Sequence, residues 1–475
     1  MNNKHFFKNM AKLALPIALQ QLLVSCAQLV DTAMVTPLGN VIVSAVGVSS
    51  RWIFLMNLFY FGISSGSAAL ISQFWGAKEE KHIRSSYGVA LIFGTGVALV
   101  AFAAMFFFPD QLIRVFSNEA PVIAEARKYM RIVAFMGLFS SFNQITCVVL
   151  RATEKVNPPL YSSIAAVAVN TVLNYILING KLGFPVMGIS GAAAATLISA
   201  AVQSLILIIY INTAKQVFKA PPTEFFRLTG AFVRRFSVTC LPVVFNEGIW
   251  AIGTNIYSMV FARQGSEAYA GYTIFSSIEQ IAFVFFVGIC HACSIMTGKA
   301  VGAGKADEAY SMGKRFIKLV PLLGVLTGVA IIFLRNPLLR ILPIETEGAR
   351  QMTSTLLLIY SLWIGVRNIS YVCVVGIFRA GGDTKIGMFL DIGALFLFSI
   401  PIVTTLGFLT DVPFYVLIIA MYIAEDTPKS VLCLIRFKSR KWIKQLTAAD
   451  SAPPVLGEDP EIEIEEADEL KNYRQ

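Results

Sequence analysis

The sequence predicts an all-α polytopic membrane protein, with about twelve transmembrane helices in two six-helix lobes related by a pseudo-two-fold axis along the membrane normal. Three observations predict this fold: apolar stretches recur along the 475 residues, short motifs repeat at a nearly constant offset, and basic residues gather in alternate connections. Hydrophobic residues make up 56% of the chain and charged residues 14%. A soluble domain carries about a quarter charged residues, so the composition excludes an ordinary soluble protein.

The apolar stretches are long enough to cross a bilayer, since about 20 apolar residues in a helix span its hydrocarbon core. The expected spans are residues 13–35, 47–74, 87–108, 129–150, 159–179, 187–212, 236–262, 270–298, 316–334, 354–376, 386–409 and 413–435.

The distribution of basic residues predicts the orientation of these spans. If the N-terminus is cytoplasmic, the segments on its side carry 25 Lys and Arg residues, and the opposite side carries about 10. Excess Lys and Arg mark the cytoplasmic side. We therefore expect both termini to be cytoplasmic. The lack of long soluble loops fits a multi-pass protein of a bacterial plasma membrane. The formal net charge of +10 is then explained by topology without nucleic-acid binding.

Repeated motifs indicate that a six-span unit was duplicated. Leu15-Pro16-Ile17 recurs as Leu241-Pro242-Val243, and Gly76-Ala77 recurs as Gly302-Ala303 at the same offset along the chain. Leu150-Arg151-Ala152 recurs as Phe378-Arg379-Ala380 at nearly that offset. Because six is even, both copies enter the membrane from the same side, which gives an axis along the membrane normal.

The predicted domains follow from this duplication and from a change in composition near the end of the chain. We expect an N-terminal lobe at 1–220, a C-terminal lobe at 221–447 and an acidic disordered cytoplasmic tail at 448–475. The tail contains an acidic run and almost no large apolar residues, a composition typical of disorder. It serves either solubility or binding to a regulatory partner.

Two carboxylates stand inside predicted spans, Asp31 in the first and Glu247 in the seventh. A charge in hydrocarbon costs several kcal/mol unless it is paired, hydrated or protonated, so such a residue indicates an ion or substrate path. Asp31 lies about 27 Å along its helix, and Asn170 and Asn174 lie at about 18 and 24 Å along the fifth, on one face. One carboxylate with amide oxygens suits Na⁺, and the carboxylate alone suits a proton. The alternative is that Asp31 caps its helix and the asparagines join neighbouring helices.

The second half carries more intramembrane polar residues. Beside Glu247, they are Asn246 in the seventh span, Glu279 and Gln280 in the eighth, and Arg367 and Asn368 in the tenth. A buried Arg needs a carboxylate partner, so we expect Arg367 to neutralise Glu279 or Glu247 and to leave one carboxylate free for a cation. A static ion pair between Glu279 and Arg367 is the alternative. Three further charges in the twelfth span, Glu425, Asp426 and Lys429, are expected to have a structural role.

Motifs spread over residues 5–447 resemble the multidrug and toxic compound extrusion (MATE) family. The matching stretches are Leu15-Pro16-Ile17, Val30-Asp31-Thr32-Ala33-Met34, Gly76-Ala77-Lys78, Arg151-Ala152, Gly183 to Ala193, Leu241-Pro242, Asn246-Glu247, Gly302-Ala303, Arg379 to Lys385 and Arg436 to Trp442.

The resemblance implies a secondary active transporter that exports organic cations or drugs by antiport with Na⁺ or H⁺, with alternating access through a central cleft. It implies coupling-ion sites at Asp31 with partners on the fifth helix, and at Glu247. Some members of the family have an acidic residue on the fifth helix, where this chain has Asn170 and Asn174. Others have one on the tenth helix, where this chain has Asn368. A flippase for a lipid-linked precursor shares the general fold and is the alternative.

We expect small cationic substrates and membrane lipids as partners, no cofactor beyond the coupling ion, no nucleic acid, and a monomer. No metal site is expected beyond a possible Na⁺ at Asp31 or Glu247. A primary pump is disfavoured, because residues 298–305 do not fit the phosphate-binding pattern G-x-x-x-x-G-K-[ST]. An enzyme is disfavoured as well, since the zinc-binding pattern H-E-x-x-H does not occur in the sequence.

Overall fold

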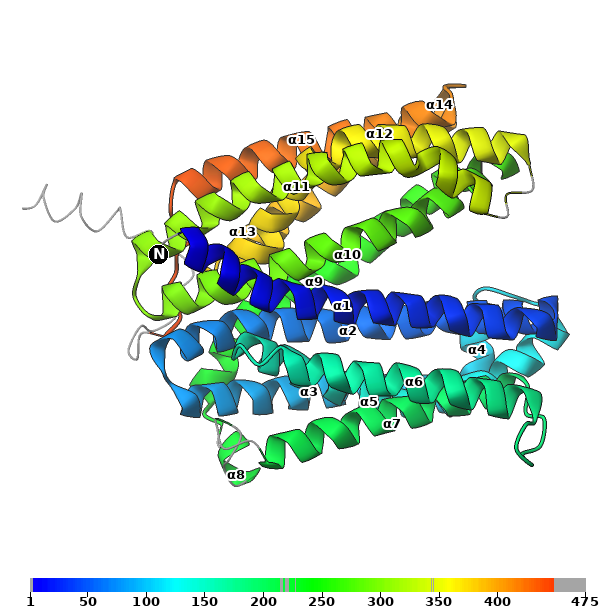
Figure 1. The fold of residues 1–475 in the computed structure, drawn as a ribbon, viewed down its shortest axis with the longest axis horizontal. Helices are drawn as coiled ribbons and strands as arrows, with labels where there is room; N and C mark the ends of the chain where they lie inside the picture. The colour runs from blue at the N-terminus through cyan, green and yellow to red at the C-terminus, as the bar shows by residue number, and fades with distance from the viewer. Residues whose placement is uncertain are drawn as a thin grey trace, which may run out of the picture.

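A computed structural model describes residues 3–213, 217, 222–226, 228–342, 344 and 346–447. The described residues form helices and turns, without a β-strand (Figure 1). The predicted acidic tail at 448–475 lies outside the described residues.

The N-terminal lobe contains six long helices, with short segments in their connections. Its elements are α1 (Asn3–Val35), η1 (Thr36–Leu38), α2 (Asn40–Ala77), α3 (Glu80–Phe107), α4 (Pro109–Arg114), α5 (Ala120–Ala152), α6 (Asn157–Asn179) and α7 (Ile189–Thr213). The short helix α8 (Pro222–Phe225) lies between the lobes in the sequence.

The C-terminal lobe repeats this plan, but π-helical segments interrupt two of its spans. Its elements are α9 (Gly230–Ala262), α10 (Ser266–Gly302), α11 (Ala306–Ile341), α12 (Glu347–Tyr371), η2 (Val372–Phe378), α13 (Thr384–Gly393), η3 (Ala394–Ser399), α14 (Ile400–Leu409) and α15 (Phe414–Lys438). The π-helical segments are η2, which continues α12, and η3, which joins α13 to α14. Such segments frequently mark functional sites.

The twelve predicted spans are all present as long helices. Among the described residues, eleven helices are long and apolar enough to cross a membrane. The remaining span, α15, falls outside that set because Glu425, Asp426 and Lys429 interrupt its apolar stretch. The protein is therefore a multi-pass membrane protein whose last helix carries an unusual internal charge cluster.

The turns of the two lobes support the duplication at the level of the backbone. Gly39 and Gly265, which stand at equivalent places in the two halves, precede α2 and α10 with φ values of 101° and 105°. Lys78 and Gly304, also an equivalent pair, both adopt the left-handed conformation after those helices. Matching backbone geometry at matching positions is expected if both lobes descend from one unit.

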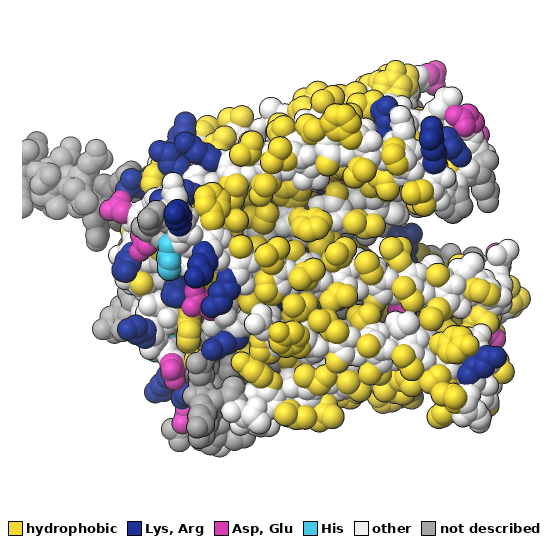
Figure 2. Space-filling model, viewed as in Figure 1, with side chains coloured by type: hydrophobic (Ala, Val, Ile, Leu, Met, Phe, Trp, Pro, Cys, Tyr) yellow, Lys and Arg dark blue, Asp and Glu magenta, His cyan; other side chains and the backbone are white. Residues whose placement is uncertain are grey.

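The helical bundle has two chemically different ends. We name as the basic end the one that holds the N-terminus and the turns at 78–79, 303–305 and 439–447, and as the distal end the opposite one. Lys and Arg side chains gather at the basic end in Figure 2. The same view shows a notch between the lobes at the distal end, where the helices of the two lobes diverge in Figure 1.

The lobes touch through the halves of α1, α2, α9 and α10 nearest the basic end. Small residues allow this close approach: a Cβ on Gly302 would lie 1.9 Å from the carbonyl oxygen of Gln73, and one on Gly76 would lie 2.0 Å from that of Lys299. Gln73 also donates a hydrogen bond across the contact to the carbonyl oxygen of Ala380, at 2.8 Å. The structure is therefore closed between the lobes at the basic end and open at the distal end.

Substitution of Gly302 tests this contact. Gly302→Val should clash with the backbone of α2, and overpacking of this kind costs about 1–3 kcal/mol. The lobes should separate at the basic end, and spin labels on the distal ends of α1 and α10 should show a shorter distance. The matched control is Gly96→Val, because nothing lies within 4 Å of a Cβ added there. Unchanged distances in Gly302→Val would contradict the assignment of the closed end.

Candidate functional site

Asp31 lies near the distal end of α1 and faces α6. The Nδ2 atom of Asn174 donates a hydrogen bond to Asp31 Oδ1 at 2.5 Å, and a weaker one to Asn170 Oδ1 at 3.3 Å. Both asparagines are buried, and Asp31 is partly exposed. The Oδ1 atom of Asn174 has no hydrogen-bond partner among the described residues. The structure thus brings together the three side chains proposed from sequence, with one carboxylate and two amide oxygens available to a cation.

Glu247 lies in α9 and is paired with a residue that the sequence suggested only as a landmark of the duplication. Arg379 Nη2 donates to Glu247 Oε1 at 2.7 Å, and both side chains are buried. The Nη1 atom of the same guanidinium donates to Ser65 Oγ of α2 at 2.9 Å. Since Ser65 belongs to the other lobe, Arg379 joins Glu247 to the contact between the lobes.

Glu279 of α10 forms an ion pair with Arg367 of α12. This is one of the two partners expected for Arg367. Asn368, the next residue, donates to the carbonyl oxygen of Ile364 in its own helix at 2.8 Å. Gln280 is exposed on α10. Among the C-terminal candidates, Glu279 and Arg367 are therefore brought together, while Asn368 and Gln280 stay outside that pair.

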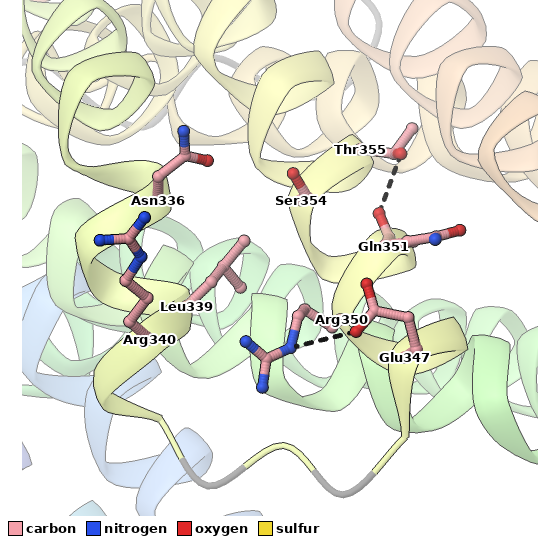
Figure 3. A pocket seen from close by; sticks show the side chains of 8 residues that line it. All are labelled: Asn336, Leu339, Arg340, Glu347, Arg350, Gln351, Ser354 and Thr355. Carbon is pink, nitrogen blue, oxygen red and sulfur yellow. Dashed lines mark hydrogen bonds and ion pairs between the residues drawn. The ribbon is translucent and has the colours of Figure 1, made fainter.

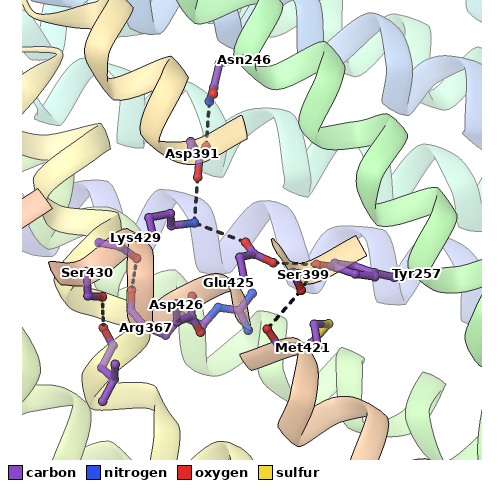
Figure 4. Close-up of polar contacts among 12 residues, drawn as sticks. Asn246, Tyr257, Arg367, Asp391, Ser399, Met421, Glu425, Asp426, Lys429 and Ser430 are labelled. Carbon is purple, nitrogen blue, oxygen red and sulfur yellow. Dashed lines mark hydrogen bonds and ion pairs between the residues drawn. The ribbon is translucent and has the colours of Figure 1, made fainter. Parts of the chain in front are cut away.

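A second charge network joins α9, α13 and α15 (Figure 4). Asp391 of α13 accepts a hydrogen bond from Asn246 Nδ2 at 3.0 Å and pairs with Lys429 Nζ at 2.8 Å. Lys429 also pairs with Glu425 at 3.3 Å, and Tyr257 donates to the other oxygen of Glu425 at 3.0 Å. All of these side chains are largely buried, so the chain of contacts holds charges away from water.

Asp426, beside Glu425, faces the opposite way. Trp363 Nε1 donates to its carboxylate at 3.0 Å, and Arg367 lies beside it. Each intramembrane carboxylate described so far in the C-terminal lobe therefore lies next to a Lys or Arg of the chain.

The two lobes differ in the partners of their carboxylates. Those of the C-terminal lobe are compensated by Arg367, Arg379 and Lys429. Within the described residues, the hydrogen-bond partner of Asp31 is the neutral amide of Asn174. A buried charge without an opposite charge is costly, so Asp31 is the carboxylate best suited to take up a cation or proton from outside the chain.

Two surface pockets lie away from these groups. The larger one, about 480 Å³, lies between the distal ends of α11 and α12 and is lined by residues such as Asn336, Arg340 and Gln351 (Figure 3). It contains none of the candidate residues. Among the described residues, no group of three or more His, Cys, Asp or Glu could hold a metal ion.

Sequence reasoning missed Arg379 as the partner of Glu247, and it did not consider Asp391. A usable signal existed for Asp391. The offset that relates Arg151 to Arg379 also relates Ser163 to Asp391, two residues of different charge. Aligning the two halves residue by residue would have drawn attention to charges that replace neutral residues.

The comparisons with known proteins agree with this architecture. Residues 16–176 and 242–405 match the protein-family model described as MatE. A probable multidrug resistance protein NorM of Thermotoga maritima is 25% identical over 460 residues, which cover 95% of this chain and 96% of that protein. The multidrug resistance protein MdtK of Edwardsiella ictaluri is 23% identical, with 83% of this chain and 86% of that protein covered.

Solved structures show the same fold. An outward-facing structure of a multidrug resistance MATE family transporter of the MOP superfamily has a TM-score of 0.83, at 18% identity, over 91% of this chain and 96% of that one. A MOP superfamily transporter from Pyrococcus furiosus, described as having a binding pocket of reverse polarity, has a TM-score of 0.82 at 18% identity, with 91% and 96% covered.

The pair of Glu247 and Arg379 can be tested by breaking it and then removing it. Arg379→Gln leaves the Glu247 carboxylate buried without its partner, which should lower the unfolding free energy by about 3–5 kcal/mol. Combining it with Glu247→Gln should recover most of this loss, because no uncompensated charge remains. Thermal denaturation of the two single variants and the double variant in detergent measures the coupling. Additive losses would show that the two side chains do not interact.

Proposed function

Because the chain belongs to the MATE family of membrane transporters, we propose that it exports organic cations by antiport with Na⁺ or H⁺, with alternating access between its two lobes. The relatives NorM and MdtK are described as multidrug resistance proteins. The observation that carries the proposal is Asp31, an intramembrane carboxylate whose hydrogen-bond partner is an amide rather than a resident cation. The protein is a transporter and not an enzyme.

The N-terminal lobe supplies the coupling site in this proposal. Asp31 is partly exposed near the distal end of α1, so in this proposal the ion arrives from that end. A Na⁺ ion would bind the carboxylate of Asp31 and the amide oxygens of Asn170 and Asn174, whereas a proton would bind Asp31 alone. Binding of either cation neutralises the carboxylate of Asp31 in its apolar surrounding. In this proposal the neutral form favours closer packing of the helices of the N-terminal lobe.

The C-terminal lobe supplies the charge that attracts the substrate. Glu247 is bound to Arg379, and a lipophilic cation that reaches Glu247 competes with that guanidinium. Displacement of Arg379 also weakens its hydrogen bond to Ser65 across the lobe contact. Substrate binding would therefore loosen the closed end, while Glu279, Arg367 and Gln280 shape the surrounding surface and the buried Asn246 and Asn368 belong to the polar contacts behind it.

The polarity of the interior favours cationic substrates over a lipid-linked diphosphate. A flippase for such a precursor needs cationic side chains free to hold phosphate. Here Arg367, Arg379 and Lys429 are each bound to a carboxylate. The proposal therefore assigns the space between the lobes to positively charged compounds.

The proposed orientation follows the basic residues. The basic end is placed in the cytoplasm of a bacterium, with the distal notch facing outward across the plasma membrane. We propose residues 1–220 and 221–447 as the two moving lobes of a monomer.

Vesicle transport tests the function and the ion together. Ethidium uptake into inside-out vesicles should be driven by an imposed gradient of the coupled ion, either Na⁺ or H⁺. Asp31→Asn and Glu247→Gln should each lower this uptake by at least about tenfold, since each removes a carboxylate that binds either the coupling ion or the substrate. Asp307→Asn, which alters an exposed carboxylate at the basic end, is the matched control. Gradient-driven uptake at the wild-type rate in Asp31→Asn would remove Asp31 from the mechanism.

A further inference from the structure

The duplication relates two hydrogen-bonded triads, one in each lobe. In the N-terminal lobe, Ser163 Oγ accepts hydrogen bonds from Gln20 Nε2 at 2.8 Å and from Gln203 Nε2 at 3.1 Å. The offset that relates Leu15 to Leu241 carries Gln20 to Asn246 and Gln203 to Lys429. The offset that relates Arg151 to Arg379 carries the central Ser163 to Asp391.

The three equivalent residues of the C-terminal lobe form the same arrangement of contacts. Asp391 accepts from Asn246 Nδ2 at 3.0 Å and from Lys429 Nζ at 2.8 Å (Figure 4). The central acceptor and its two donors keep their places in both halves, but a neutral set in one lobe is a charged set in the other. The C-terminal triad thus carries one negative and one positive charge, whereas the three residues of the N-terminal triad are neutral and Gln20 also accepts a hydrogen bond from Arg151 Nη2 at 2.6 Å.

The ammonium of Lys429 lies where a free cation would be most stable. It is held between the carboxylates of Asp391 and Glu425, and a third acid, Asp426, contributes to the negative potential. Asn246, which is 3% exposed, directs its side chain at Asp391, and its Oδ1 has no hydrogen-bond partner among the described residues. The two carboxylates that hold the ammonium, those of Asp391 and Glu425, supply oxygen ligands of the type that hard cations such as Na⁺ prefer.

We propose that Lys429 is a tethered counter-cation, whose ammonium occupies the position in the C-terminal lobe that a mobile coupling ion would otherwise take. The lysine confines ion coupling to the N-terminal lobe. Each transport cycle then uses one ion, which binds at Asp31. This inference rests on the proposed function and deepens it by giving the number of ion sites and the residue that sets it.

The buried side chain of Lys429 keeps its ammonium in the network. Lys429 is 10% exposed, so its ammonium cannot leave the network without opening α15 against α13. A covalently attached cation has a high effective concentration at its site, and a free ion competes poorly with it. Lys429→Gln removes the ammonium and leaves the carboxylates of Asp391 and Glu425 close together. A free cation is then needed to compensate their charges.

Ion-dependent stability tests the inference in the full-length protein. Asp31→Asn first removes the N-terminal site, and thermal denaturation is then measured in NaCl against KCl at equal ionic strength. Asp31→Asn alone should show no Na⁺ response. Asp31→Asn with Lys429→Gln should gain a saturable Na⁺-dependent rise in Tm, and adding Asp391→Asn should weaken the apparent Na⁺ affinity about tenfold or more.

The matched control keeps the charge. Lys429→Arg in the Asp31→Asn background should show no Na⁺ response. The inference is overturned if Asp31→Asn with Lys429 intact keeps a Na⁺ response that Asp391→Asn removes, or if the Lys429→Gln combination gains none.

A second measurement does not need a stable Lys429→Gln protein. Equilibrium binding of ²²Na⁺ to the wild type should give at most one site per chain, and Asp31→Asn should abolish it. Two sites in the wild type, or one that survives Asp31→Asn and is lost with Asp391→Asn, would overturn the inference. Normal gradient-driven transport by Asp31→Asn would instead contradict the proposed function, whereas the occupation of the C-terminal ion position by Lys429 is decided by the Na⁺ response of the Lys429→Gln combination.

Discussion

A carboxylate placed among apolar helices must find a positive partner, and this constraint organises the interior of the protein. The cost of an unpaired charge is several kcal/mol in hydrocarbon. The C-terminal lobe meets it with its own side chains, because Arg379 binds Glu247, Arg367 binds Glu279, and Lys429 binds Asp391 and Glu425. In the N-terminal lobe, Asp31 has an amide as its described partner, and a mobile ion is the remaining way to compensate its charge.

The duplication explains how one fold accommodates both solutions. The backbone repeats closely, down to the left-handed turns after α2 and α10 and the close contacts at Gly76 and Gly302. The side chains then diverge at equivalent positions: Gln20 corresponds to Asn246, Ser163 to Asp391, and Gln203 to Lys429. A symmetric scaffold with asymmetric charges allows one lobe to respond to the ion and the other to the substrate.

The sequence predicted the fold well because the length and composition of an apolar span are local properties. The spans and their duplication could be recognised from single stretches of chain. The ends were less accurate: the first span was expected at residue 13, but α1 begins at Asn3, and Phe6 is buried in the core of the C-terminal lobe. The contact that buries Phe6 is between lobes, so no local pattern records it.

The candidate site was predictable in part for the same reason. Asn170 and Asn174 share a helix face with a spacing of four, and their depth matched that of Asp31. The pairing of Glu247 with Arg379 could not be found in this way, because it depends on how α9 packs against the residues that follow η2. Intramembrane charges such as Lys429 could be noticed, but their partners become known only when helices distant in sequence are placed side by side.

Competition between ion and substrate provides the most direct test of the central claim, that Asp31 is the carboxylate compensated by the coupling ion. Equilibrium binding of a fluorescent organic cation to purified protein would be measured over a range of Na⁺ concentrations and of pH, for the wild type and for Asp31→Asn. The account predicts that either Na⁺ or protons weaken binding to the wild type and that this dependence is absent in Asp31→Asn. An ion dependence of undiminished size in Asp31→Asn would contradict it.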